Sequence, residues 1–142
     1  MSGELRARAV GGRTELAACT TADMVRSRRS LEIIEAAGLI EQAGPKGQRL
    51  VAGLETLRDE SGLISNVRGR GLFVAFDLKT REDRDDIVND LRTVEHLIVL
   101  PCGERSIRFR PALSVSQEEI DEAVGATSRS VVRVASKELQ YT

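Results

Sequence analysis

The hydrophobic pattern of this chain changes period after Ser61-Gly62, and the change limits the folds open to it. Before this point apolar residues recur every three or four positions, as on one face of an α-helix. Beyond it, in 67–78 and 107–111, apolar residues alternate with others, as on a strand with one buried face. Helices followed by mixed strands and helices predict an α+β domain, a small sheet covered by helices.

Two helices are predicted before the change of period. Residues 1–14 hold two adjacent glycines and no sustained apolar period, so we expect a mobile arm. Thr20-Thr21 and Gly38 mark the start and end of the first helix. The second is predicted over 39–58, with Pro45 either kinking its first turns or marking its true start. We expect the apolar stripes of both helices to pack on a common core.

Three strands and two helices are predicted after the change of period. Gly69 and Gly71 permit a bulge or a close backbone approach in the first strand, and they do not form a phosphate-binding glycine motif. The last two strands are close enough in sequence for a hairpin. In chain order, the elements are a strand over 67–78, a short helix after Thr80, a strand over 96–101, a strand over 107–111 and a helix after the capping box Ser116–Glu119.

Composition excludes several kinds of partner and site. The net charge of −1 gives no overall field toward nucleic acid or anionic lipid. Cys19 and Cys102 are far apart and lack metal-ligand spacing, so we expect free thiols. Free thiols and the lack of an apolar signal segment at the N-terminus together predict a cytoplasmic location. The acids at 82–86 are explained by the dipole of a helix N-terminus rather than by a metal, and the lone His96 is expected at the surface.

The segment Ile107-Arg108-Phe109-Arg110-Pro111 is the strongest candidate for a binding site. Strand alternation places Ile107 and Phe109 on one face and both arginines on the other. A guanidinium is a permanently charged fork of N–H donors that can hold a carboxylate in bidentate fashion. Two interpretations follow from this pattern: a strand that grips an acidic small molecule, or an edge strand whose exposed face happens to carry arginine.

Several runs together resemble the C-terminal small domain of class III pyridoxal-phosphate aminotransferases, nearest to the L-lysine 6-aminotransferases within that class. The resemblance implies the α+β fold of that domain, with a mostly antiparallel sheet, over residues 20–142 behind a divergent, mobile leader at 1–19. It extends in one order from about Asp23 to Val134. The runs are 23–35, 68–72, 98–101, 107–111 and 114–116.

The resemblance implies a role for Arg108, which by position is the family's arginine that binds the substrate carboxylate. In the intact family, the ε-amino group of L-lysine passes to 2-oxoglutarate on pyridoxal 5′-phosphate. Lys46, Lys79 and Lys137 all align with the small domain, so none is the Schiff-base lysine, and we expect no covalent cofactor and no transamination by this chain alone. Its expected partners are an amino-acid or 2-oxo-acid carboxylate, an aminotransferase large domain and a second copy in a homodimer.

A second departure concerns the family's Ser/Thr-Trp-Gly-Gly-Asn stretch, which is absent where it would fall, at 15–20. The sequence therefore resembles the last third of an aminotransferase, as a truncated or split gene product would. Two alternatives remain. Residues 68–76 are similar to the glycine- and aromatic-rich strand of an RNA-recognition motif, although Arg70 and Leu72 stand where stacking aromatics are needed. Alternatively, the chain is a non-catalytic partner that docks on a full-length aminotransferase through exposed apolar faces.

Overall fold

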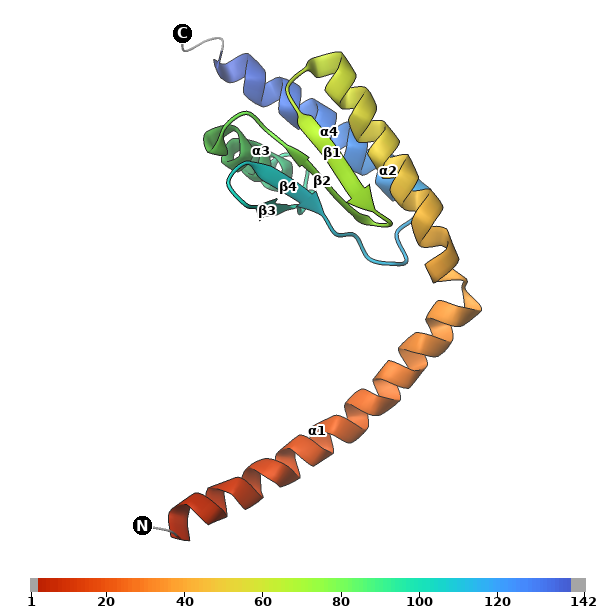
Figure 1. Cartoon of the computed structure of the whole chain (residues 1–142), viewed down its shortest axis with the longest axis vertical. Helices are drawn as coiled ribbons and strands as arrows, with labels where there is room; N and C mark the ends of the chain where they lie inside the picture. The colour runs from red at the N-terminus through yellow and green to blue at the C-terminus, as the bar shows by residue number, and fades with distance from the viewer. Residues whose placement is uncertain (1–2, 139–142) are drawn as a thin grey trace. The chain divides into compact units, whose positions relative to one another are not determined.

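A computed structural model describes residues 3–138 of the 142, and the side chains of residues 20–137. The chain separates between Gly38 and Leu39 into two units, which are described individually. The first unit consists of helix α1, and the second contains the sheet and the remaining helices (Figure 1).

Helix α1 (Gly3–Ala36) begins well before the predicted start at Thr20. Most residues from 4 to 18 are Ala, Leu, Arg or Glu, and their helix propensity outweighs the cost of two adjacent glycines. The predicted end is confirmed, since Gly38 takes a positive φ of 57° directly after the helix. Met24 and Leu31 of this helix are 66% and 65% exposed, and the expectation that its apolar stripe packs on a common core stays a prediction.

Helix α2 (Leu39–Ser61) places Pro45 inside its first turns. This position excludes the alternative in which Pro45 marks the start of the helix. The apolar stripe faces inward as predicted, and Leu50, Leu54 and Leu57 are buried. Gly47 is also buried, at a point where the helix comes close to the backbone of Gly71.

The sheet has four antiparallel strands, β1 (Ser65–Arg70), β2 (Phe73–Asp77), β3 (Leu100–Cys102) and β4 (Ser106–Phe109). Their order is β1-β2-β4-β3, so β4 lies between β2 and β3. Helix α3 (Arg81–Thr93) connects β2 to β3, and helix α4 (Gln117–Glu138) follows β4. The predicted α+β class, with a small antiparallel sheet covered by helices, is confirmed (Figure 1).

Two strand predictions need correction. The segment 67–78 is not one strand but a hairpin, because Arg70 pairs with Phe73 and leaves a two-residue turn. Gly71 takes a φ of 54° in that turn, as the first turn position of a type II′ hairpin requires. The predicted strand at 96–101 begins only at Leu100, because the segment after α3 turns back and the Leu97 N–H bonds to the carbonyl of Leu91.

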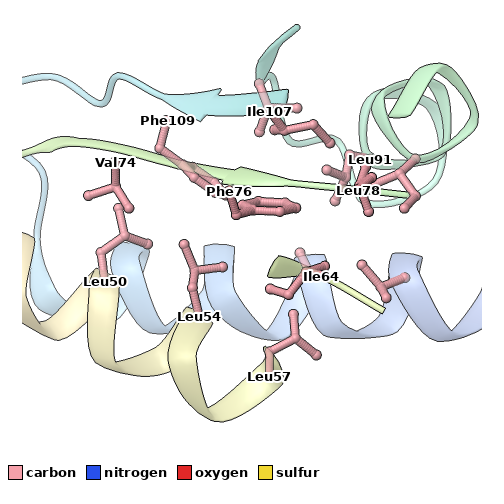
Figure 2. Packing of buried hydrophobic residues seen from close by; sticks show 14 of the residues in the cluster. Leu50, Leu54, Leu57, Ile64, Val74, Phe76, Leu78, Leu91, Ile107 and Phe109 are labelled. Atoms are coloured by element: carbon pink, nitrogen blue, oxygen red, sulfur yellow. The ribbon is translucent and has the colours of Figure 1, made fainter. Parts of the chain in front are cut away.

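The core lies between one face of the sheet and helices α2 and α4. Figure 2 shows Leu50 and Leu54 of α2 directed toward Val74 and Phe76 of β2. Phe109 and Phe76 pack as a tilted aromatic pair with ring centroids 6.2 Å apart. The predicted capping boxes that start α3 and α4 are both present, at Thr80–Asp83 and Ser116–Glu119.

We predict that Gly47→Ala destabilises the second unit. A Cβ at position 47 would overlap the carbonyl group of Gly71, and relieving such overpacking costs about 1–3 kcal/mol. Gly125→Ala in α4 is the matched control, because its Cβ would meet only the flexible end of Arg129, at 3.3 Å. Urea unfolding followed by circular dichroism should show a lower midpoint for Gly47→Ala alone. Equal midpoints for the two variants would contradict the close approach.

Candidate carboxylate-binding site

Helices cover one face of the sheet and leave the other face open. Ile107 is fully buried and Phe109 is 5% exposed, both on the face covered by helices. The other face, which no helix of the second unit covers, carries Arg108 and Arg110 from the segment of β4. The predicted alternation of apolar and cationic side chains along this strand is therefore confirmed.

Arg108 lies in the middle of this open face. Its cross-strand partners are Ala75 on β2 and Leu100 on β3, neither of which offers a side-chain acceptor. The Nε atom of Arg108 is buried and has no hydrogen-bond partner among the described residues. No ion pair among the described side chains includes Arg108. A buried donor without a partner costs free energy. An acceptor group from a ligand would remove this cost by accepting a hydrogen bond from the guanidinium.

Arg68, in the same cross-strand row, has a different environment. Its Nη1 donates to Asp77 Oδ1 at 2.8 Å, and the Ser106 hydroxyl donates to the same oxygen at 2.6 Å. The Asn66 amide donates to Asp77 Oδ2 at 2.8 Å. Burial alone would raise the pKa of Asp77, but the hydrogen bonds from Ser106, Asn66 and Arg68 outweigh it and lower that pKa below its ordinary value. Asp77 thus neutralises Arg68 and leaves Arg108 unpaired.

Sequence reasoning missed this acid-centred network. Arg68 and Asp77 meet only because the hairpin turn at Gly71 folds β1 back on β2. With 67–78 read as one strand, the two residues would lie far apart. One signal was available in the sequence. Asp77 stands between the apolar residues Phe76 and Leu78, and a charged residue in such a run is buried only with a hydrogen-bonded or charged partner.

The guanidinium of Arg110 lies over the ring of Phe73, with 5.3 Å between its Cζ and the ring centroid. Phe73 is 52% exposed on the open face, opposite Arg70 of β1. This is a cation–π contact at a solvent-accessible position, which orients the guanidinium without neutralising it.

The residues that the sequence analysis set aside as site candidates are each accounted for without a ligand. His96 is exposed, as expected, in the loop after α3, and Asp83 accepts from the Thr80 N–H in the helix cap. Cys102 is a free thiol, and the side chain of Cys19 lies outside the described residues. Among the described residues, no group of three metal-ligating side chains occurs.

The lysines of the chain are the residue type to which the family's cofactor would attach. Its three lysines are Lys46, buried on α2, and Lys79 and Lys137, both exposed. None of the three lies on a strand of the sheet. Phe76 is fully buried on the helix-covered face, so it cannot stack on a nucleotide base together with Phe73, as the RNA-binding alternative requires.

The fold agrees with the comparisons to known proteins. The aminotransferase class-III family matches residues 16–131, and the chain belongs to that family. Enzymes of this family generally depend on pyridoxal phosphate.

Several of the matching relatives are lysine aminotransferases. L-lysine-epsilon aminotransferase from Mycobacterium tuberculosis is 47% identical over 115 residues, covering 80% of this chain and 25% of the relative. The Amycolatopsis lactamdurans enzyme of that name is 42% identical over 111 residues, covering 78% and 25%. Lysine aminotransferase from M. tuberculosis in the internal aldimine form is structurally similar, with a TM-score of 0.76 and 45% identity, covering 79% and 26%. The chain thus spans about a quarter of these relatives.

Within the residues that the structure describes, no helix combines the length and the apolar character needed to cross a bilayer.

We predict that Asp77→Asn destabilises the fold at neutral pH. The substitution leaves Arg68 without its carboxylate partner, and losing charge-assisted hydrogen bonds to a buried group costs about 1–3 kcal/mol. Because folding lowers the pKa of Asp77, its contribution is fully present above the unfolded pKa of about 4 and is lost as the pH falls through the folded pKa.

The free energy of unfolding is measured in urea at pH 7 and at pH 3 for wild type and Asp77→Asn. The difference between the two proteins should be larger at pH 7 than at pH 3. Asp59→Asn removes an exposed acid paired with Arg58 and is the control, with little effect expected. A pH-independent difference between wild type and Asp77→Asn would contradict the network.

Proposed function

We propose that this chain is the C-terminal substrate-recognition domain of a lysine 6-aminotransferase-like enzyme, with residues 20–142 as the domain and 1–19 as a divergent leader. In this proposal Arg108 binds the carboxylate of an amino acid or a 2-oxo acid. The chemistry of transfer from L-lysine to 2-oxoglutarate belongs to an intact enzyme, and this chain alone does not catalyse it.

The observation that carries the proposal is the unpaired guanidinium of Arg108. It is half-buried between Ala75 and Leu100 on a strand whose other face is anchored in the core. Such anchoring fixes where the charge sits before a ligand arrives. A fixed donor fork holds a distant carboxylate and thereby orients the reacting end of the same molecule, and orientation supplies a large part of an enzymatic rate.

The cofactor supplies the electron sink for amino transfer when it is bound in enzymes of this family. The positions of Lys46, Lys79 and Lys137 support the view that its covalent anchor lies outside this chain. A large domain, as a separate chain or part of a longer one, and a second copy of the enzyme are the proposed partners.

We predict that Arg108→Gln lowers the affinity of the full chain for 2-oxoglutarate by roughly tenfold or more, the scale of a hydrogen-bonded contact to a charged group. Titration followed by nuclear magnetic resonance of the backbone amides measures the affinity. Arg105→Gln removes the same charge from an exposed position before β4 and should leave the affinity nearly unchanged. Equal affinities for wild type and Arg108→Gln would exclude the proposed role.

A second candidate function is docking, as a non-catalytic partner, on a full-length aminotransferase. The exposure of apolar side chains on the open face favours it, since Phe73 and Leu100 are 52% and 38% exposed there. Docking of this kind would bury the same face that carries Arg108.

For this candidate, we expect the chain to co-elute with purified lysine aminotransferase from M. tuberculosis in size-exclusion chromatography with light scattering. Replacing Phe73 with Ser should weaken the complex by roughly tenfold or more, because an apolar side chain of this size contributes about 1.5–3 kcal/mol when buried. Val132→Ser, at an exposed position on α4, is the control. A chain that remains monomeric beside the enzyme would rule out docking on it.

A further inference from the structure

The segment that follows α3, residues 94–98, forms one wall of a mostly apolar cleft in the second unit; we call it the strap. The cleft has a volume of about 470 Å³, and its other walls come from the segment after β4 and the first half of α4. We propose that an electrostatic latch at Glu95 holds the strap closed, and that release of this latch opens the cleft while the sheet stays folded. The latch does not involve Arg108, so it stands or falls separately from the proposed function.

Glu95 joins the strap to α4 through both oxygens of its carboxylate. Its Oε2 accepts a hydrogen bond from Arg129 Nη2 at 2.6 Å, and its Oε1 accepts one from Arg133 Nη2 at 2.5 Å. The Glu95 side chain is only 8% exposed, so salt screens these pairs less than pairs at the surface. Hydrogen bonds between two charged groups are among the strongest polar contacts in proteins, and here two of them meet on one residue of the strap.

The rest of the strap has few contacts that could hold it in place. Of the described residues 96–98, only Leu97 donates a backbone hydrogen bond, to the carbonyl of Leu91 at 2.9 Å. His96 takes a φ of 55°, a conformation that costs free energy for a residue with a Cβ atom. Ile98 is 81% exposed. Segments with few buried contacts and few backbone hydrogen bonds open locally before the whole fold does, and loss of the latch leaves the strap in that condition.

The opening is limited to the strap because its far end is anchored. Val99, the next residue, is 6% exposed in the core, and β3 begins directly after it. Phe109 and Ile120, which line the cleft opposite the strap, are themselves members of the core cluster. Release of Glu95 therefore moves one wall of the cleft and leaves the others fixed.

Acid is one means of releasing the latch. The hydrogen bonds from Arg129 and Arg133 lower the pKa of Glu95 below its ordinary value. The closed strap is therefore fully favoured above the ordinary pKa of about 4.3, and it loses this support as the pH falls through the lowered pKa. The other titratable groups around the latch are Asp90 on α3, Glu122 and Lys137 on α4, and His96 on the strap.

Native-state hydrogen exchange of the full chain, followed by nuclear magnetic resonance, tests the latch at one amide. The Leu97 N–H is protected while the strap is closed, and the amides of β2 and β4 report on the rest of the unit. Glu95→Gln keeps the shape of the side chain and removes its charge. At pH 7 it should lower the protection factor of Leu97 roughly tenfold or more, the scale of hydrogen bonds to a charged group, and leave β2 and β4 nearly unchanged.

Wild type alone gives an independent measurement. As the pH is lowered from 7 to 3, Leu97 should lose protection in wild type before β2 and β4 do, whereas in Glu95→Gln its protection should already be low at pH 7. A Leu97 amide that keeps its protection in wild type until the whole sheet loses it would overturn the latch.

Glu122→Gln is the matched control. Glu122 also pairs with Arg129, at 2.8 Å, but it belongs to α4 itself and its side chain is 73% exposed. Leu97 should therefore be protected in this variant as in wild type. Equal protection of Leu97 in wild type and Glu95→Gln would show that Glu95 does not hold the strap. A loss of protection shared equally by Leu97, β2 and β4 would also contradict the proposal, since Glu95 would then stabilise only the unit as a whole.

Discussion

The packing of Ile107 and Phe109 into the core is the interaction on which the site depends. Their burial in the core cluster fixes which face of β4 looks inward. Because a strand alternates strictly, the same contacts decide that Arg108 looks outward. A shift of one residue in register would exchange the two faces, burying the charge and exposing the apolar side chains, and its cost keeps the guanidinium in place.

On the open face, one arginine is paired with an acid and another is not. This difference determines where the face carries an uncompensated positive charge. Asp77 collects hydrogen bonds from Asn66, Arg68 and Ser106, and so one arginine is used for structure. The cross-strand partners of Arg108 are Ala75 and Leu100, whose side chains offer no acceptor. In a family whose substrates are amino acids and oxo acids, a free guanidinium on a rigid strand is suited to their recognition.

Local patterns predicted much of this structure, and residues whose geometry depends on distant partners escaped prediction. Both capping boxes and the faces of β4 follow from spacing alone. The turn at Gly71 could not be predicted from spacing, because the apolar alternation continues across it. The network around Asp77 depends on that turn and was therefore missed as well. The long extension of α1 follows from helix propensity, which the adjacent glycines obscured. The role proposed for Arg108 came from the family resemblance, since an arginine on the open face of a strand is by itself ambiguous.

The two outer strands also have a consequence for how copies of this domain meet one another. Unpaired backbone groups at a sheet border can recruit strands from other molecules and nucleate aggregates. Here β3 has only three residues, and its central one, Pro101, has no amide hydrogen to offer a neighbour. On the opposite border, an irregularity between Ser65 and Arg68 bends β1. Both borders thus offer few regular backbone groups to a strand from another molecule.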